Sequence, residues 1–375
     1  MSQFIYPMKV LHIVSTMDRG GAESLIMSIY RNIDHSKLQF DFITHSSNKG
    51  GYDDEILSLG GRIFNVPSLG SCGPVSYVKK LTSIMSQNSY AAVHSHTDFQ
   101  SGFPTLSAKL SGVPKRISHS HSNNWPNGNG MKARATLKLL RLLIKWTATD
   151  YCCCSDEAGE FLFGKKSKVE VLNNGINVRE FTSVTVQSRN SVLKELALPK
   201  DVRLIGHVGR FSESKNHLFI LKVMKRLIEE DEKYMLLLVG DGPLIEKIKA
   251  EAEKLGILKS VRFLGVRDDI PRLMNAFDMF LFPSLFEGFG IVTIEAQSAG
   301  TPCVVSDRVP KTTDMGLNLM TYLSLDEGID SWAEKIKLSI QANKPSVDII
   351  HSNFERKGFD IKKNIPTWLS LYGVT

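Results

Sequence analysis

Short apolar runs alternate with segments of helical period along most of the chain. In the first half, the runs 8–15 and 91–96 stand on either side of amphipathic stretches such as 75–88. Apolar runs of this length, separated by helical patterns, are typical of parallel strands that are buried on both faces. The alternation restarts near Arg203 with a second set of runs. The sequence therefore predicts the α/β class, with two parallel-sheet domains in series.

A polar, turn-rich segment separates the two halves of this pattern. Residues 173–192 have the composition of a linker, so we place the domain boundary there. We expect a first domain over 1–185, a second over 186–358 and a final helix within 359–375. A chain of 375 residues with 42% hydrophobic positions is large enough for two such cores.

The composition indicates which kind of partner and which compartment the chain has. A net charge of +7 and a pI near 9.0 favour an anionic partner, such as a nucleotide, a nucleic acid or a membrane surface. The five cysteines form no C-x-x-C pair, so we expect reduced thiols in a cytoplasmic protein. No apolar stretch reaches about 18 residues, and the N-terminus has no signal-like apolar region, so we expect no membrane-spanning helix.

One stretch, FPSLFEGFGIVTIEA, combines two carboxylates with a glycine turn. Glu287 stands before Gly-Phe-Gly, and Glu295 follows about one turn inside the helix that we expect to begin at Ile291. Glycines let the backbone approach a ligand, and free N–H groups at a helix start favour an anion. A sugar nucleotide fits, because its phosphates suit the N–H groups and its hydroxyls suit the carboxylates. A helix start with acids that merely favour the helix dipole is the alternative.

Two cations follow a strand in the same predicted domain. Arg210 and Lys215 lie in GRFSESKNH, directly after the run RLIGHVG. Parallel α/β sheets bind ligands outside the carboxyl ends of their strands, and both side chains suit phosphate. We therefore expect the two cations to bind phosphate beside the acidic loop, with unliganded loop cations as the alternative.

Other glycine motifs are weaker signals. Gly20 and Gly21 follow the first strand and could place N–H groups near an anion, although a tight turn explains them equally well. The sequence GDGP at 240–243 lacks the third glycine of a dinucleotide fingerprint, and the chain has neither a P-loop nor a D-x-D pair. We therefore disfavour a nicotinamide enzyme and expect no cofactor and no metal.

Two strand ends in the predicted first domain carry histidines at alternating positions. His94 with His96, and His119 with His121, each share one face of their strand. A four-histidine metal site is conceivable, but we expect none, because two parallel strands rarely aim all four rings inward. His96, His119 and His121 are instead candidates to line a cleft, and a structural role for one ring of each pair is the alternative.

The segment 131–149 has the pattern of a basic amphipathic helix. Four cations recur at spacings that place them on one helical stripe: Arg134, Lys138, Arg141 and Lys145. Such a helix is typical of membrane-surface contact, and an ordinary half-buried surface helix is the alternative. We do not expect nucleic acid as a partner, because no exposed aromatics interleave with the cations and no known binding module is present.

Taken in order, four of these motifs resemble the retaining glycosyltransferases of family 4. They are GRFSESKNH, LLLVGDGPL, FLG and FPSLFEGFGIVTIEA, and the family's E-x7-E pattern corresponds to Glu287 and Glu295. The resemblance covers nearly the whole chain. The start, VLHIVSTMDRGGAESLIMSIYRNID, and the stretch VHSHTDFQSG are similar to the subgroup that builds bacterial exopolysaccharide or capsule.

The resemblance implies a GT-B fold, in which two Rossmann-like domains face each other across a cleft and the last helix crosses back to the first domain. It implies that Arg210 and Lys215 neutralise the diphosphate of a nucleotide-sugar donor, that Glu287 binds the donor sugar and that Glu295 binds the ribose. His121 matches the family's T-x-H histidine, and His119 takes the threonine slot, so either ring could face the sugar. The remaining implied donor contacts are Gly20 and Gly21 at the phosphates, Gly265 and Val266 beside the base, and the backbone of Gly288, Phe289, Gly290 and Ile291.

The implied reaction is metal-independent transfer of a hexose with retention. Departure of the nucleoside diphosphate develops negative charge, which Arg210, Lys215 and the helix start are placed to stabilise. No residue is an obvious nucleophile, so a front-face route, in which the leaving phosphate accepts the proton, follows from the resemblance. Family habit favours a UDP-sugar. The basic segment 131–149 favours a lipid-linked acceptor and attachment of the chain to the inner face of the cell membrane.

Two other functions are weighed against this one. A GT-B enzyme of sugar-nucleotide metabolism, such as an epimerase, would share the fold, but the basic segment favours a membrane-borne acceptor. A non-catalytic subunit of a glycan assembly is disfavoured because Arg210, Lys215, Glu287 and Glu295 are all present.

Overall fold

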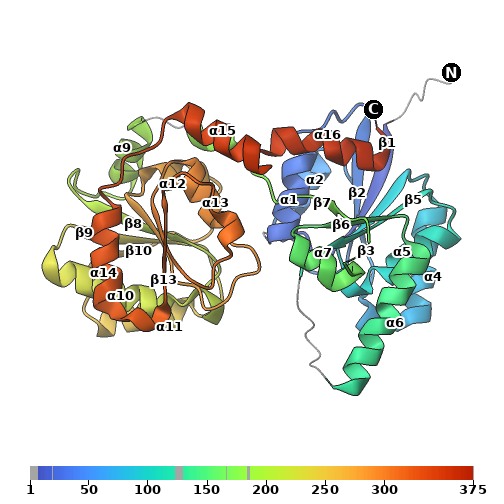
Figure 1. Cartoon of the computed structure of the whole chain (residues 1–375), viewed down its shortest axis with the longest axis horizontal. Helices are drawn as coiled ribbons and strands as arrows, with labels where there is room; N and C mark the ends of the chain where they lie inside the picture. Colours follow the sequence, from blue (N-terminus) through green and yellow to red (C-terminus); the bar gives the residue numbers. More distant parts are fainter. Residues whose placement is uncertain (1–6, 19, 123–129, 166, 184–185, 375) are drawn as a thin grey trace. The chain divides into compact units, whose positions relative to one another are not determined.

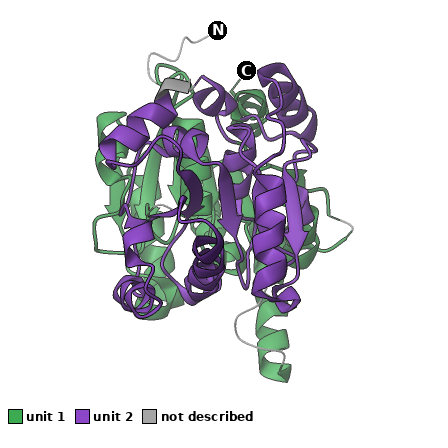
Figure 2. Cartoon of the chain, turned by 90° about the vertical axis from the view of Figure 1, so that its left-hand side faces the viewer, with its two compact units in different colours: residues 1–175, 361–375 green, residues 176–360 purple. Residues whose placement is uncertain are grey.

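The structure is a computed structural model that describes residues 7–18, 20–122, 130–165, 167–183 and 186–374 (Figure 1). The chain divides into two compact units, which Figure 2 shows in different colours: unit 1, residues 1–175 with 361–375, and unit 2, residues 176–360. The division falls after Gly175 rather than near residue 185. The expected linker at 173–192 is also wrong in part, because it contains α8 (Val178–Thr182) and the start of α9 (Val186–Glu195).

Unit 1 is built on a seven-stranded parallel sheet in the order β3-β2-β1-β4-β5-β6-β7. The strands are β1 (Met8–Ile13), β2 (Leu38–Thr44), β3 (Ile63–Asn65), β4 (Ala92–Ser95), β5 (Lys115–Ser120), β6 (Asp150–Cys153) and β7 (Glu170–Val171). The strand order changes direction between β1 and β4, and in such sheets ligands bind beyond the carboxyl ends of the strands at that point.

Helices cover both faces of the first sheet. They are α1 (Gly21–Tyr30), α2 (Asp53–Ser58), α3 (Leu69–Cys72), α4 (Pro74–Ser86), α5 (Gly102–Leu110), α6 (Met131–Thr147), α7 (Asp156–Phe163) and α16 (Ile361–Tyr372). On one face, α1 and α16 enclose a core that includes Trp368 and Tyr372, so the last helix of the chain belongs to unit 1. On the other face, side chains of α4 and α5 pack on the sheet, among them Leu81 and Ala108.

Unit 2 repeats this plan with a six-stranded parallel sheet in the order β10-β9-β8-β11-β12-β13. The strands are β8 (Arg203–Val208), β9 (Tyr234–Val239), β10 (Val261–Phe263), β11 (Met279–Phe282), β12 (Cys303–Ser306) and β13 (Met320–Leu323). The change of direction lies between β8 and β11. Every residue of β9 and β11 is buried, which explains why these strands appear in the sequence as continuous apolar runs.

Two helical layers enclose the second sheet. Side chains of α10 (His217–Glu230), α11 (Ile245–Lys254) and α14 (Gly328–Ser339) share one core. The other core includes side chains of α8, α9, α12 (Ile270–Ala276), α13 (Ile291–Ser298) and α15 (Val347–Lys357). Both units are thus Rossmann-like three-layer structures, as the sequence predicts. Within the described residues, no helix combines the length and the apolar character that crossing a membrane would need.

Candidate active site

Two loops meet at the carboxyl edge of the sheet in unit 2. The first follows β8 and leads into α10, and the second follows β11 and leads into α13. The backbone N–H of Leu285 donates to the carbonyl of Ser214 at 2.8 Å, and the side-chain amide of Asn216 donates to the carbonyl of Pro283 at 3.1 Å. Asn216 adopts a left-handed conformation, with φ of 55°, which asparagine tolerates better than most residues. These contacts hold the predicted cationic and acidic loops side by side.

Lys215 and Glu287 form an ion pair where these loops meet. The Lys215 Nζ lies 2.5 Å from Glu287 Oε1, and the two side chains keep only 19% and 8% of their exposure. The same ammonium lies 4.8 Å from the ring centroid of Phe282, at the end of β11. A pair this buried must be well oriented to offset its desolvation. The ion pair therefore fixes the orientation of the Lys215 cation and the Glu287 carboxylate.

The GDGP sequence brings the backbone of a neighbouring loop against the Arg210 loop. A Cβ on Gly240 would lie 2.2 Å from the Gly209 carbonyl oxygen, and the φ of Gly240 is +130°. Only glycine fits such an approach. The motif thus supports the loop that carries Arg210, whose exposed guanidinium forms no ion pair with the described residues.

The glycine turn after Glu287 leaves open space at the start of α13. Gly288 has no atom within 4 Å of where a Cβ would stand, and Gly290 caps the helix with a φ of +84°. The first N–H groups of a helix have no acceptor inside it, so the turn beginning at Ile291 can bind an anion. Phe289 is partly buried and stacks on Phe359 with centroids 5.7 Å apart.

The position expected beside the nucleotide base lies just after β10. Gly265 has a φ of +66° and open space around its Cβ position, and its carbonyl accepts from the Gly240 N–H at 2.8 Å. The side chain of Val266 is 57% exposed. An exposed apolar side chain on a fixed turn is suited to pack against a flat ring.

Glu295 lies on α13 with its carboxyl group largely shielded from water. Burial raises its pKa to about 7, and the negative charge of Glu180 on α8 adds to the effect. The side-chain amide of Asn177 donates to Glu180 at 2.8 Å and holds that carboxylate in place. Sequence reasoning missed Glu180, because it lies in the segment expected to be a linker.

Two buried histidines lie beneath the cationic loop of unit 2, and the sequence pattern did not single them out. His207 Nδ1 lies 2.9 Å from the Leu281 carbonyl oxygen, and its ring meets that of His217 edge-on at 4.7 Å. His217, the first residue of α10, stacks on Phe211 at 4.3 Å. Burial lowers the pKa of both rings, to about 4 for His217, so they support the Lys215 loop without adding charge.

The glycine pair of unit 1 lies at the start of α1. Gly20 is the N-cap residue, and its N–H already donates to the Asp18 carbonyl at 2.9 Å. Gly21 is the first helical residue and has open space around its Cβ position. In this structure Gly21, at the helix start, is therefore the better placed of the two to meet an anion.

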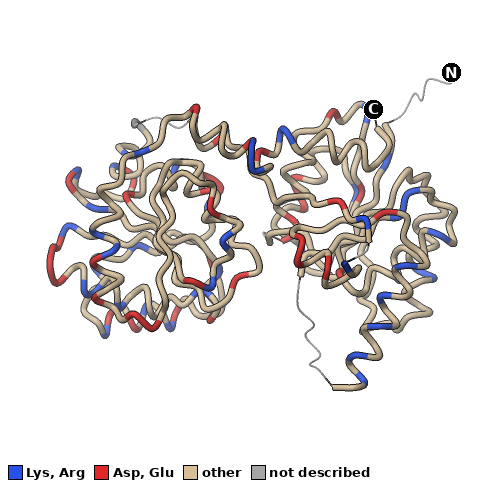
Figure 3. The backbone as a smooth tube through the Cα atoms, in the orientation of Figure 1, with Lys and Arg blue, Asp and Glu red and all other residues tan. Residues whose placement is uncertain are grey.

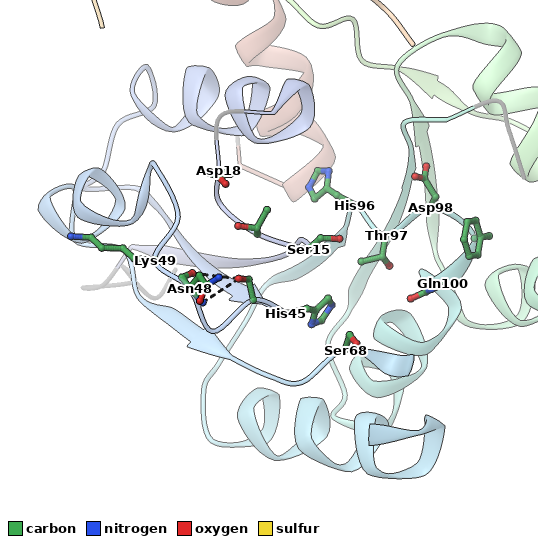
Figure 4. A pocket seen from close by; sticks show the side chains of 13 residues that line it. Ser15, Asp18, His45, Asn48, Lys49, Ser68, His96, Thr97, Asp98 and Gln100 are labelled. Atoms are coloured by element: carbon green, nitrogen blue, oxygen red, sulfur yellow. Dashed lines mark hydrogen bonds between the residues drawn. The ribbon is translucent and has the colours of Figure 1, made fainter. Parts of the chain in front are cut away.

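A polar pocket opens at the carboxyl edge of the sheet in unit 1 (Figure 4). Its volume is about 590 Å³, and Figure 4 shows His96, Asp98 and His45 among its walls. The complete lining is Ser15, Thr16, Asp18, His45, Ser46, Asn48, Lys49, Ser68, His96, Thr97, Asp98, Phe99 and Gln100. A space of this size, surrounded by hydroxyl, amide, imidazole and charged groups, suits a sugar-sized polar ligand.

Five histidines gather beside this pocket, which corrects the expectation that parallel strands would not aim their rings together. They come from three neighbouring strands and the residues that follow them: His12, His94, His96, His119 and His121. Nitrogen atoms lie 3.1 Å apart between His12 and His96, 2.9 Å between His96 and His121, and 3.1 Å between His94 and His119. The ring of His119 is fully buried, whereas His121 is only half-buried. Of the two candidates, His121 is therefore the more exposed ring, and it contacts the pocket-lining ring of His96.

Two triplets in this cluster are the described side chains that could hold a metal ion. In each triplet, His12 with His94 and His96, or His96 with His119 and His121, the nitrogen atoms lie within 4.8 Å of one another. The rings of His94 and His96 stack at 4.2 Å, and those of His119 and His121 at 4.0 Å. Lone pairs lie in the plane of an imidazole, so stacked rings would have to rotate before they could share one ion.

The predicted basic helix is α6, and its exposed surface is both cationic and apolar. Figure 3 shows Lys and Arg along α6 without an acidic residue. Leu139, Leu142 and Trp146 are 67%, 53% and 64% exposed and recur at helical spacing. Arg141, by contrast, donates to the Phe161 carbonyl and lies over that ring, so it leaves the predicted stripe.

Family comparisons cover both units. Residues 19–180 match the family described as Glycosyltransferase Family 4, and residues 188–356 match Glycosyl transferases group 1. The chain is 42% identical to the putative glycosyltransferase EpsF of Bacillus subtilis, over 98% of this chain and 97% of that protein.

Two relatives at lower identity are also named as glycosyltransferases. The chain is 26% identical to an Escherichia coli enzyme named UDP-Gal:alpha-D-GlcNAc-diphosphoundecaprenol alpha-1,3-galactosyltransferase, over 80% of this chain and 79% of that one. It is also 26% identical to the capsular polysaccharide biosynthesis glycosyltransferase CapH of Staphylococcus aureus, over 90% and 92% of the two chains.

A solved structure agrees with the fold. HepE of Anabaena, crystallised with UDP, superposes with a TM-score of 0.77 at 19% identity, over 98% of this chain and all of that chain. This likeness supports the fold alone. Both Rossmann-like units match family models, and a putative glycosyltransferase is 42% identical over nearly the whole of both chains. The chain therefore belongs to glycosyltransferase family 4 and has the GT-B fold.

Proposed function

We propose that this glycosyltransferase moves a hexose, with retention of configuration, from a UDP-sugar to a lipid-linked glycan during bacterial exopolysaccharide or capsule synthesis. The observation that carries the proposal is the Lys215–Glu287 pair at the start of α13. It brings a lysine, a carboxylate and a helix N-terminus to one sheet edge, and these groups suit phosphate and sugar hydroxyls.

The donor half of the proposal assigns one role to each group. Lys215 and Arg210 bind the diphosphate and stabilise the charge that develops on it as the sugar leaves. Glu287 accepts from hydroxyls of the sugar, and Glu295 from those of the ribose. The transfer needs no metal, because two cations and a helix start supply the positive charge. The UDP in HepE and the UDP-Gal in the name of the Escherichia coli relative favour uridine.

The acceptor half rests on unit 1 and on α6. The pocket beside His96 is polar and large enough for a sugar, and His121 stands at the strand end next to it. The exposed Leu139, Leu142 and Trp146, beside Lys138 and Lys145, suit the inner, anionic face of a cell membrane. The diphosphoundecaprenol in the name of one relative supports a lipid-linked acceptor, and the name of CapH supports a role in polysaccharide synthesis.

Sugar transfer to membrane lipid tests this proposal. Membranes from the source bacterium are incubated with the full chain, EDTA and radiolabelled UDP-sugars, and the label is followed into the lipid extract. We expect lipid-extractable label with the wild-type chain and at least about a hundredfold less with Lys215→Ala or Arg210→Ala. Near wild-type transfer by these variants, or label that appears only in a changed soluble sugar, would refute it.

A further inference from the structure

Three imidazole rings form an unbroken hydrogen-bonded row from the core of unit 1 to the carboxyl edge of its sheet. His12 lies in β1, His96 directly follows β4, and His121 directly follows β5. His12 Nδ1 lies 3.1 Å from His96 Nε2, and His96 Nδ1 lies 2.9 Å from His121 Nε2. His96 therefore uses both of its nitrogens, and Nδ1 is the nitrogen of His121 that the row leaves for a ligand.

The protons of this row are tightly constrained. Burial lowers the pKa of each ring, to about 3 for His12 and about 4 for His121, so all three are neutral near pH 7. A neutral imidazole has one N–H and one bare nitrogen. The central ring must therefore donate on one side and accept on the other. All hydrogen bonds in the row then point the same way, either outward to His121 or inward to His12.

The buried end of the row favours the outward direction. Among the described residues His12 Nε2 has no hydrogen-bond partner, and the ring of His12 packs against Phe40 and Phe42. In the inward direction this nitrogen would carry a buried N–H without an acceptor, and such orphaned donors are rare in folded proteins. In the outward direction Nε2 is bare, and the remaining proton of the row stands on His121 Nδ1.

We infer that His12 and His96 are positioning residues that hold the ring proton of His121 on Nδ1, so that His121 presents an N–H to a substrate oxygen. The substrate part of this inference rests on the proposed function. His121 is then a neutral hydrogen-bond donor rather than a base, and its partner is a hydroxyl or phosphate oxygen. The two rings behind it act through the proton that they fix.

A hydrogen bond also fixes the backbone at His121. Asp98 Oδ1 accepts the His121 backbone N–H at 2.6 Å, and Asp98 has a φ of +48°, a left-handed conformation that is unfavourable for aspartate. Figure 4 shows Asp98 on the pocket wall near His96. A second row, Tyr372–His94–His119, lies against the first, and His119 stacks on His121. The ring plane, the backbone and the proton of His121 are thus each fixed by a different contact.

Nuclear magnetic resonance of the ring nitrogens tests the inference directly. The full chain is labelled with 15N-histidine, freed of any affinity tag, and measured without ligand in EDTA near pH 7.5. Protonated and bare nitrogens resonate in separate ranges, and His121→Gln assigns the signal. We expect one tautomer of His121, with the proton on Nδ1. A proton on Nε2, a cationic ring, or one tightly bound zinc ion per chain would overturn the inference.

A matched set of variants links the tautomer to catalysis. His12→Phe keeps the ring volume but removes the inner end of the row, whereas Phe40→Leu disturbs the same core and leaves the row intact. His12→Asn restores a donor near the Nδ1 position. We expect His12→Phe to give mixed His121 tautomers and about tenfold lower kcat, with KM changed less than about threefold. Phe40→Leu and His12→Asn should keep one tautomer and most of kcat.

Equal kcat in His12→Phe and Phe40→Leu, with the Nδ1 tautomer retained in both, would refute the role of the row. If His12→Phe does not fold, the wild-type tautomer and the His12→Asn variant still decide the question. An inactive wild-type chain with every UDP-sugar would count against the proposed function. It would leave the tautomer measurement, which uses no ligand, to judge the row by itself.

Discussion

Mild acid should unfold unit 1, because four buried imidazoles and the half-buried ring of His121 are held without charge at one edge of its sheet. Burial lowers the pKa of His12 to about 3 and that of His121 to about 4, and it lowers the pKa values of His94, His96 and His119 well below 6.5. In the unfolded chain each ring titrates near 6.5, so below that pH the unfolded chain binds more protons. The stability that neutral rings allow is complete above pH 6.5 and is lost as the pH falls.

The size of the effect follows from these shifts. Between about pH 7.5 and 5.5, each ring that gains a proton only on unfolding lowers the free energy of unfolding by about 1.4 kcal/mol, and five rings by about 7 kcal/mol. Asp98, whose pKa burial raises to about 6, gains a proton in the folded state and offsets about 0.8 kcal/mol. Burial also raises the pKa of Glu23, so Glu23, like Asp98, offsets part of the loss of stability at lower pH. A net loss near 6 kcal/mol matches the whole stability of many domains.

Urea unfolding at a series of pH values measures this loss. Trp332→Phe leaves tryptophans only in unit 1, among them the buried Trp368, whose ring lies 5.4 Å from that of His94. Their fluorescence therefore follows unit 1 alone. His12→Phe should reduce the proton uptake on unfolding by about one. A change of less than about 2 kcal/mol over the interval would mean that the rings are protonated or hydrated in the folded chain, and would refute the reasoning.

Three further predictions test other parts of the structure. If Glu295 must be ionised to accept hydrogen bonds from ribose, the affinity for UDP should fall below about pH 7. Glu180→Gln removes the negative charge that raises the pKa of Glu295, so it should move this fall to lower pH in calorimetric titrations. An unchanged pH profile would exclude an effect of Glu180 on Glu295. The double variant Leu139→Ala/Trp146→Ala should sediment with phosphatidylglycerol vesicles about tenfold less than the wild-type chain. Leu258→Ala, at another exposed apolar site, should sediment like the wild-type chain. Equal loss of vesicle binding in both variants would argue against membrane binding through α6. Gly240→Ala should lower the free energy of unfolding of unit 2, measured in urea, by about 2–4 kcal/mol, because the added Cβ would meet the Gly209 carbonyl. Gly288→Ala is the control: its Cβ would point into open space, so this variant should unfold like the wild-type chain.

The fold was predictable because hydrophobic period and strand length report directly on burial. The central strands β1, β4, β8, β9 and β11 are short apolar runs, and the structure confirms them. The segment 173–192 was misjudged because the helices there are short and polar on their outer faces, which in sequence resembles a linker. Helix formation in α8 depends on packing against α12 and α13, which no local pattern reveals.

The part of the site that lies within one continuous motif was predictable. The loop before α13 places Glu287, Gly290 and Ile291 by local chain direction, so their arrangement could be foreseen. Contacts between distant segments could not. Asn216 and Glu180 act through residues far away in sequence, and His12 stands alone in an apolar run, where one polar residue gives no signal.

Calorimetric titration of UDP into the full chain in EDTA tests the central claim most directly, because it asks whether the Lys215 edge binds a nucleoside diphosphate without metal. We predict that UDP binds the wild-type chain, that Lys215→Ala and Arg210→Ala each weaken binding at least about tenfold, and that Lys222→Ala, an exposed cation on α10, leaves it unchanged. Binding that requires a divalent metal, or equal UDP affinity in Lys215→Ala and the wild-type chain, would contradict it.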